Sequence, residues 1–279
     1  MERNLKIIIA KHIGFCFGVK RALSIAEKSL KEDPKPIQFL GPLVHNEKVV
    51  EELKRKGGKI IAHLKKIKSG TLILRAHGEV LSPEKIKKNV LIKDTTCPLV
   101  KRAQDAAKLL VKQGYQVIII GDQNHPETKG IKKYAEGRVI IIENVSQAKK
   151  LPNFKKIGVI SQTTQDLNMV NRILEILKNK TRDFKWINTL CPEVQARQKE
   201  LKKILKKCDG VLVIGSPSSA NTKRLAEIIK NAKKKVLLIN STKKLKKNKL
   251  KGISFLGIVS GTSAPDWTVK KIIEKLKAL

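Results

Sequence analysis

Short runs of apolar, largely β-branched residues recur along the chain, and most are followed by turn residues and then by a segment with helical periodicity. Such alternation is typical of βαβ units, in which consecutive strands pair in parallel and helices cover the sheet. Continuous apolar runs such as VIII at residues 117–120 fit strands that are buried on both faces. The pattern therefore predicts an α/β fold with mostly parallel sheets.

The segments are assigned from length, β-branched content and apolar spacing. The expected strands are residues 5–10, 71–76, 90–94, 116–121, 139–144, 156–161, 184–189, 210–215, 235–240 and 253–259. The expected helices are residues 18–30, 46–56, 98–113, 165–178, 193–207, 220–232 and 266–277. The chain has 279 residues, which is enough for two or three α/β domains of ordinary size.

A cysteine-centred motif is repeated within this framework. CFGVKRA begins at Cys16, CPLVKRA begins at Cys97, and a looser copy, CPEVQARQ, begins at Cys191. Each cysteine falls between an expected strand and an expected helix, which is the edge of a parallel sheet where open α/β folds bind ligands. Helix N-termini also favour thiolate over thiol through the helix dipole. The repeat therefore predicts three equivalent cysteine sites.

The three copies divide the chain into pseudo-equivalent α/β domains, which we expect at residues 1–97, 98–191 and 192–279. Three soft ligands at a common centre favour zinc or an iron–sulfur cluster. Zinc held by three cysteines normally uses a CxxC pair, which the sequence lacks, whereas a [4Fe–4S] cluster held by three thiolates leaves one iron open to substrate. Three unrelated buried thiols are the alternative. Cys208 lacks the repeat and is expected to pack in a core.

The chain is strongly basic, with 60 Lys+Arg against 24 Asp+Glu and a formal net charge of +36. The excess is mostly lysine, is spread along the whole chain, and comes with few aromatic residues that could stack on bases. We therefore expect solvated helix faces and no nucleic-acid partner. No apolar run approaches the roughly 20 residues that span a bilayer, and the N-terminal segment lacks the features of a signal peptide. These features predict a cytoplasmic protein that is not attached to a membrane.

Polar residues gather after several of the expected strands. Histidines follow three apolar runs, at His45, His77 and His125. Turns rich in hydroxyls, amides and glycines lie at residues 161–164, 215–224 and 260–265. Backbone N–H groups and hydroxyls at such turns bind phosphate oxygens, although Ser and Thr are also common helix caps. Together these segments predict an anion pocket that faces the three thiols.

The same segments resemble the motifs of a known enzyme family. In chain order they are GFCFGVKRA, GPLVHN, RAHG, TTCPLV, NHPE, SQTT, the GS…N…RL segment and SAPD, and they resemble 4-hydroxy-3-methylbut-2-enyl diphosphate reductase. The resemblance extends from residue 14 to residue 266 and implies a trefoil of three α/β domains around a central iron–sulfur cluster. It implies reductive dehydroxylation of that diphosphate to isopentenyl and dimethylallyl diphosphates, the last step of the methylerythritol phosphate route to isoprenoids.

The resemblance also implies roles for individual residues. The implied ligands of a [4Fe–4S] cluster are Cys16, Cys97 and Cys191, and the implied proton donor is Glu127. The implied contacts of the substrate diphosphate are His45, His77, Ser219, Asn221 and Ser263, with His125 and Thr163 near its hydroxymethyl end. For a reductase that receives electrons from a small carrier, the strongly cationic surface predicts an acidic partner, a ferredoxin or flavodoxin, although the sequence does not identify the electron donor.

Two positions depart from the family pattern. Ala220 stands where a second serine usually precedes Asn221, and Val194 stands where a threonine usually helps to relay protons to the glutamate. Neither change alters an implied cluster ligand or Glu127, so we expect the activity to be retained. Two alternatives stay open: a basic RNA-associated binding protein that keeps a reductase fold, and a zinc hydrolase that uses the same cysteines.

Overall fold

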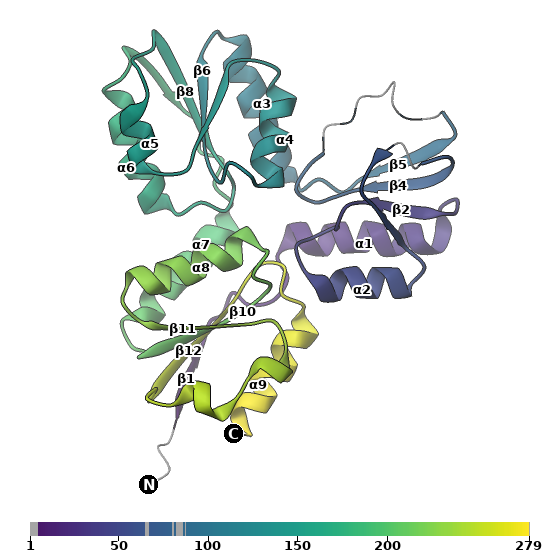
Figure 1. Cartoon of the computed structure of the whole chain (residues 1–279), viewed down its shortest axis with the longest axis vertical. Helices are drawn as coiled ribbons and strands as arrows, with labels where there is room; N and C mark the ends of the chain where they lie inside the picture. The colour runs from purple at the N-terminus through teal and green to yellow at the C-terminus, as the bar shows by residue number, and fades with distance from the viewer. Residues whose placement is uncertain (1–4, 65–66, 80, 82–85, 87, 279) are drawn as a thin grey trace. The chain divides into compact units, whose positions relative to one another are not determined.

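The computed structural model describes residues 5–64, 67–79, 81, 86 and 88–278 (Figure 1). The chain forms two compact units. The first consists of Met1–Val19, His45–Val50 and Pro192–Leu279, and the second of Lys20–Val44 and Glu51–Cys191. The described residues form three four-stranded sheets in which every pair of strands is parallel, one in the first unit and two in the second. The predicted α/β class with parallel sheets is confirmed.

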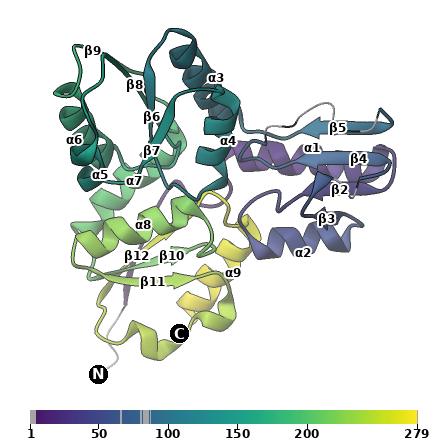
Figure 2. The ribbon, with the colours of Figure 1, turned by 45° about the horizontal axis from the view of Figure 1, so that its top comes forward.

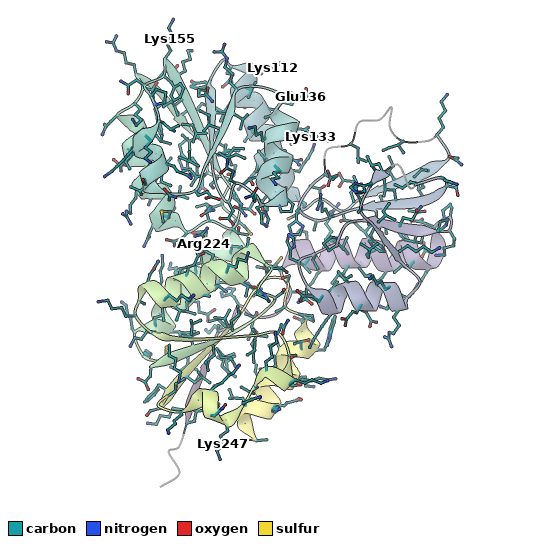
Figure 3. All side chains as sticks on the ribbon, in the orientation of Figure 1. Lys112, Lys133, Glu136, Lys155, Arg224 and Lys247 are labelled. Carbon is teal, nitrogen blue, oxygen red and sulfur yellow. The ribbon has the colours of Figure 1, made fainter. Side chains whose placement is uncertain are left out.

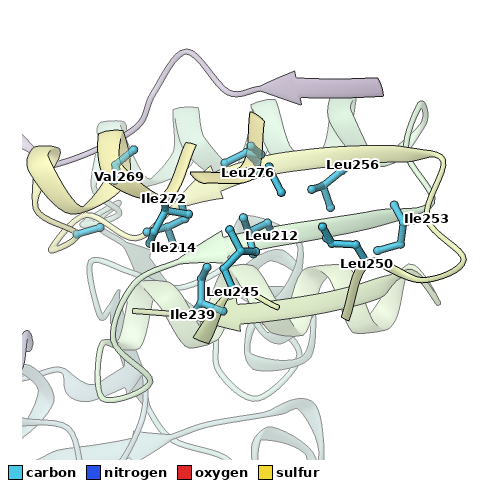
Figure 4. Packing of buried hydrophobic residues seen from close by; sticks show 12 residues of the cluster. Leu212, Ile214, Ile239, Leu245, Leu250, Ile253, Leu256, Val269, Ile272 and Leu276 are labelled. Carbon is cyan, nitrogen blue, oxygen red and sulfur yellow. The ribbon is translucent and has the colours of Figure 1, made fainter. Parts of the chain in front are cut away.

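Sheet A, in the first unit, has the strand order β1-β12-β10-β11. Its strands are β1 (Lys6–Ile9), β10 (Gly210–Ile214), β11 (Lys235–Ile239) and β12 (Phe255–Ser260). Its helices are α7 (Pro192–Leu205), α8 (Ala220–Asn231) and α9 (Asp266–Lys277), and the short 3-10 helices η3 (Thr242–Lys244) and η4 (Lys247–Leu250) precede β12. Figure 4 shows how Val269 and Ile272 of α9 pack against Leu212 and Ile214 of the sheet. The opposite face of the sheet packs against α7 and α8.

Sheet B, in the second unit, has the order β3-β2-β4-β5. Its strands are β2 (Ile37–Leu40), β3 (Lys59–Ile61), β4 (Gly70–Leu74) and β5 (Val90–Asp94), and the helices of this part of the chain are α1 (Phe17–Glu32) and α2 (Glu47–Arg55). Helix α1, from Lys20 onward, lies along this sheet in both views (Figures 1 and 2). The sequence pattern missed β2 and β3 because Gln38 interrupts the apolar residues of β2 and because β3 has only three residues.

Sheet C, also in the second unit, has the order β7-β6-β8-β9. Its strands are β6 (Gln116–Ile120), β7 (Val139–Ile142), β8 (Lys156–Ser161) and β9 (Asp183–Trp186). Helices α3 (Pro98–Lys112) and α4 (Pro126–Ala135) cover one face, and α5 (Val145–Lys150) and α6 (Leu167–Lys178) cover the other (Figure 2). Successive side chains of a strand point to opposite faces, so Val117 packs under α3 and α4 while Ile118 packs under α5 and α6.

The three sheets share one topology. In each, a first strand (β2, β6 or β10) lies between the second and third strands, and a fourth strand (β5, β9 or β1) pairs with the third at the edge. The fourth strand leads directly to one of the repeated cysteines, and the helix after that cysteine lies over the next sheet, as α3 lies over β6 and β8 and α7 over β12. Each cysteine therefore marks the passage from one sheet to the next.

The N-terminal strand does not belong to the sheet that follows it. Residues 1–97 were expected to form one domain, yet β1 pairs with β12, with Lys6 opposite Phe255 and Ile9 opposite Ile258. Among the described residues no strand follows β12, and β1 occupies the edge of the sheet where a fourth strand would pair. The other domain bounds stay predictions.

Lysine side chains dominate the outer surface. Lys112, Lys155 and Lys247 extend away from the ribbon, and all three are exposed (Figure 3). This agrees with the solvated surfaces expected from the composition. Across the described part of the chain, no helix combines the length and apolar character that crossing a bilayer requires.

Candidate active site

Each of the three repeated cysteines makes an equivalent backbone hydrogen bond. The N–H of Cys16 donates to the carbonyl of Thr262 at 3.0 Å, that of Cys97 to Ala76 at 3.0 Å, and that of Cys191 to Thr163 at 2.9 Å. Each acceptor lies two residues after the third strand of its sheet, since β12 ends at Ser260, β4 at Leu74 and β8 at Ser161. The sequence repeat is therefore also a repeat in the way the cysteine loops are held.

The fourth cysteine lies in a different environment. Cys16, Cys97 and Cys191 are partly exposed, whereas Cys208 is buried in the core that α7 forms with sheet A. Burial raises the pKa of the Cys208 thiol and so disfavours the thiolate that binds metals. The prediction that Cys208 packs in a core is confirmed.

Glu127 is buried in the first turn of α4, with only 2% of its surface exposed. Its Oε1 accepts a hydrogen bond from the Thr163 N–H at 2.7 Å, and its Oε2 accepts one from the Thr163 hydroxyl at 3.0 Å. Desolvation raises the pKa of this carboxyl to about 7, because the charge of Asp122 adds to burial and the two Thr163 bonds only partly oppose it. A carboxyl with such a pKa is protonated for a large part of the time near neutral pH.

Thr163 connects this carboxyl to a cysteine loop. Its N–H and hydroxyl donate to Glu127, and its carbonyl accepts from the N–H of Cys191. The described contacts therefore bring together three residues that the sequence analysis singled out separately, at residues 127, 163 and 191. All three belong to the second unit.

Two of the expected substrate-binding histidines lie close together in the second unit. The rings of His77 and His125 meet edge to face, with 5.7 Å between their centroids. His125 is the N-cap of α4, and its Nδ1 accepts the N–H of Glu127 at 3.1 Å, which fixes the orientation of its ring. Sequence periodicity missed α4, although Pro126 at the first helical position and the acidic Glu127 behind it are helix-start signals.

In the first unit, two loops bring His45 and Ser263 together. The hydroxyl of Ser263 donates to the carbonyl of His45 at 3.3 Å, and the side-chain amide of Asn46 donates to the carbonyl of Ser263 at 2.9 Å. The Oδ1 of Asn46 also accepts the N–H of Lys48 at 3.1 Å at the start of α2. Sequence reasoning missed Asn46, although an Asn at the start of an expected helix is a capping signal.

Ser219 and Asn221 lie at the start of α8 in the same unit. Ser219 is the N-cap and its hydroxyl accepts the N–H of Thr222 at 3.5 Å. Asn221 is 1% exposed, and among the described residues neither atom of its side-chain amide has a hydrogen-bond partner. A buried amide without partners is costly, which makes this side chain a candidate for ligand binding.

A carboxylate that sequence reasoning missed lies beside this helix start. Glu47 accepts the hydroxyl of Ser216 at 2.7 Å, and Ser216 in turn lies 2.8 Å from the Ser218 hydroxyl. Burial opposes ionisation of Glu47, but the bonds from Ser216, its own N–H and Ser218 outweigh it and hold the pKa of the carboxyl below its ordinary value. These serine hydroxyls therefore already have an anionic partner.

A family model described as LytB protein matches residues 7–277. The chain belongs to the LytB family. Among curated LytB relatives, the 4-hydroxy-3-methylbut-2-enyl diphosphate reductase of Geobacter sulfurreducens is 37% identical over 276 residues, which cover 98% of this chain and 97% of the relative. The reductase of Caldanaerobacter subterraneus subsp. tengcongensis is 38% identical over 281 residues, covering 99% and 98%.

Solved structures agree with this LytB assignment. The chain matches the E-1-hydroxy-2-methyl-but-2-enyl-4-diphosphate reductase of Plasmodium falciparum with a TM-score of 0.92 at 33% identity, covering 98% of this chain and 88% of that one. A second structure, described as the reductase that is the terminal enzyme of the non-mevalonate pathway, matches with a TM-score of 0.69 at 34% identity, covering 99% and 100%. The family resemblance and the implied fold of three α/β units with parallel sheets are confirmed, and the RNA-binding alternative finds no support. An iron–sulfur cofactor is a general property of this LytB family.

Proposed function

We propose that the chain reduces 4-hydroxy-3-methylbut-2-enyl diphosphate to isopentenyl and dimethylallyl diphosphates. The reaction takes up two electrons and two protons, breaks the allylic C–O bond, forms a C–H bond and releases water. Besides family membership, the arrangement around Thr163 supports the proposal most directly. It joins a buried carboxyl whose pKa is raised to about 7 to the loop of an implied cluster ligand.

The proposal assigns a [4Fe–4S] cluster to Cys16, Cys97 and Cys191. The donor set supports it, because these three thiols are partly exposed and equivalently held, whereas the fourth is buried in a core. Such a cluster supplies electrons and, at its open iron, a Lewis-acid site for the substrate oxygen. The protein contributes three loops, each fixed by the hydrogen bond from the cysteine N–H to a carbonyl after the neighbouring strand.

Glu127 is proposed as the proton donor to the leaving oxygen. Its carboxyl is buried, and Thr163 holds both carboxyl oxygens in place. General acids work best when their pKa lies near the working pH, which the value of about 7 satisfies. His125, which caps the same helix turn, is proposed to lie with Thr163 near the hydroxymethyl end of the substrate.

The diphosphate is proposed to bind to His45, His77, Ser219, Asn221 and Ser263. Asn221 supports this because its buried amide has no partner among the described residues, and Ser219 because it lies at a helix N-terminus, where backbone N–H groups favour anions. The loss of one hydroxyl at Ala220 leaves both residues in place.

Electrons are proposed to arrive from an acidic carrier protein, a ferredoxin or flavodoxin, in the cytoplasm. The net charge of +36 supports such a carrier because opposite charges raise the rate of encounter. The four free cysteines support a reducing compartment.

The deciding experiment is anaerobic purification followed by iron and sulfide counts, an absorption spectrum, and an assay of both diphosphate products with a chemical reductant. We expect iron, acid-labile sulfide and product formation from the same preparation. Zinc in place of iron, with hydrolysis and no reduction, would overturn the proposal in favour of a metallohydrolase.

A further inference from the structure

The arginine in each copy of the repeat reaches the loop of a different cysteine. Arg21 follows Cys16 by five residues, yet its Nη1 donates to the carbonyl of Thr96 at 3.1 Å. Thr96 is the residue directly before Cys97. The first copy of the motif therefore contacts the second cysteine.

The second copy repeats this relationship with the third cysteine. Arg102 follows Cys97 by five residues, and its Nη2 donates to the carbonyl of Asn188 at 3.3 Å and to that of Leu190 at 3.5 Å. Leu190 directly precedes Cys191. The geometry is the same as for Arg21, with an arginine on one helix and a carbonyl just ahead of the next cysteine.

The third copy closes the series. Arg197 lies six residues after Cys191, and its Nη2 donates to the carbonyl of Gly14, two residues before Cys16, at 2.9 Å. Its Nη1 donates to the carbonyl and the hydroxyl of Ser260 at 3.2 and 3.1 Å, and the hydroxyl of Ser260 also accepts the N–H of Gly14 at 2.7 Å. Arg197 is 6% exposed, which makes it the most buried of the three.

The topology explains why each arginine contacts the loop of the next cysteine and not that of its own copy. The helix after each cysteine covers the following sheet, and in parallel α/β units it runs antiparallel to the strands. Its first turns therefore lie at the carboxyl edge of that sheet, which is where the fourth strand delivers the next cysteine. For the third copy this strand is β1, so Arg197 meets the N-terminal loop.

The other repeated positions have structural roles. Val19, Val100 and Val194 are buried, and so are Ala22 and Ala103, so these positions pack in the protein interior. Lys20 and Lys101 are exposed. Within the repeat, the arginine side chain reaches another cysteine loop in all three copies. A backbone contact, from the Phe17 N–H to Oε1 of Glu193 at 3.1 Å, also joins the first copy to the third.

We propose that Arg21, Arg102 and Arg197 are positioning residues that form a closed cycle, in which each fixes the loop of the next cluster ligand. The inference rests on the proposed role of the three cysteines. A guanidinium that binds backbone carbonyls makes charge-assisted hydrogen bonds, which are about twice as strong as neutral ones. The loop of each ligand therefore depends on an arginine from the helix that follows another ligand.

Amide hydrogen exchange of the full chain, purified anaerobically, tests the cycle directly. In Arg21→Met the N–H of Cys97 should exchange about tenfold faster, while that of Cys16, five residues from the substitution, should be unchanged. Arg197→Met should speed the exchange of the Cys16 N–H. Arg102→Met should speed the exchange of the Cys191 N–H, and this should be the smallest of the three effects because Arg102 is exposed. Each arginine-to-lysine variant should restore part of the protection of the cysteine N–H against exchange, since a single ammonium replaces the several N–H donors of the guanidinium. Arg172→Met, at an exposed position of α6, is the matched control.

A second readout is the rate at which iron is lost to a chelator, which should rise in all three methionine variants and not in Arg172→Met. Faster exchange at the cysteine nearest in sequence, with the next cysteine unchanged, would overturn the cycle. If Arg197→Met does not fold, Arg197→Lys and Arg21→Met still decide the matter. If the wild-type chain binds no iron, the proposed function fails, but the exchange pattern still reports on the cycle, so the two failures are distinguishable.

Discussion

The Thr163 N–H lies 2.7 Å from Oε1 of Glu127, and the Thr163 carbonyl accepts the N–H of Cys191. A single residue thus orients the buried carboxyl and holds one end of a cysteine loop. The pKa of Glu127 stays near 7 despite these bonds, because burial outweighs them. The protonation of this carboxyl and the geometry of the cysteine loops can each be tested separately.

Turnover should fall as pH rises through about 7, because Glu127 then ionises and no longer donates a proton. Glu127→Gln should lose roughly 10²–10⁴-fold in kcat while keeping its iron content, since the amide preserves shape but is not acidic. The measurement is kcat against pH with a chemical reductant at saturating substrate. If the residual kcat of Glu127→Gln still declined across this pH range, ionisation of Glu127 would not be the cause of the decline in the wild type.

Glu127 should also make the free energy of unfolding depend on pH. Its pKa is raised from 4.5 to about 7 on folding, so its stabilising contribution is complete below about 4.5 and is lost as pH rises through about 7. The loss is on the order of 3 kcal/mol, because a tenfold change in the acid dissociation constant corresponds to about 1.4 kcal/mol. Urea unfolding of wild type and Glu127→Gln at pH 5 and pH 8 isolates this group. Equal pH dependence in the two proteins would contradict the assignment.

Serine substitution should separate the cysteines by role. Cys16→Ser, Cys97→Ser and Cys191→Ser should each abolish or sharply reduce iron and sulfide content, and Cys208→Ser should retain both, because that thiol lies in the core. Iron and sulfide counts after anaerobic purification give the answer. Loss of the cluster in Cys208→Ser together with its retention in one of the other three would show that the repeat does not mark the ligands.

Gly14→Ala should displace the Cys16 loop. A Cβ at this position would lie 1.9 Å from Oδ1 of Asp266, the atom that accepts the N–H of Phe15 at 2.9 Å. Gly57→Ala is the matched control, since Gly57 also has positive φ but a Cβ there would meet nothing within 4 Å. Left-handed strain of about 1–2 kcal/mol is common to both variants. Only Gly14→Ala should also lose iron, and equal iron contents would rule out this role for the glycine.

Carrier-driven turnover should fall steeply with ionic strength. Salt shortens the Debye length from about 10 Å at 0.1 M to about 3 Å at 1 M, which weakens the attraction between an acidic carrier and a surface of net charge +36. Turnover with a small uncharged reductant should change much less. Both rates are measured at saturating substrate, so that capture of the anionic diphosphate does not contribute. A parallel fall of both rates would mean that the lysines do not guide the carrier.

The sequence predicted the elements whose signals are local. Each expected strand and helix corresponds to an element of the structure, and all three cysteine loops lie at strand-to-helix junctions. The pattern missed β2 and β3, which contain no apolar run longer than two residues. It also missed α4 and α5, which have only ten and six residues and so give a weak helical period. The alternative of three unrelated buried thiols is not favoured, because the three thiols are partly exposed and each cysteine N–H makes an equivalent hydrogen bond.

Relationships between distant segments were not predictable in this way. Arg197 and Gly14 are separated by 183 residues, and neither segment contains a sequence signal that predicts contact with the other. The membership of β1 in sheet A is of the same kind, because an apolar strand next to a helix reads alike whichever sheet it joins. Asn46 and Glu47 were missed because their partners, Ser263 and Ser216, lie in loops that only the fold brings near.

The pairing of β1 with β12 has a consequence for biosynthesis. The ribosome releases β1 long before residues 255–260, so this strand waits with an unpaired edge while the rest of the protein is made. Cys16 obtains its acceptor, the Thr262 carbonyl, only at that late stage. The repeated cysteine that is translated first is therefore the last to be held, and a nascent chain that stalls before β12 presents at most two of the three thiols in their final loops. A cluster bound as we propose would then be completed only after β12 has been translated.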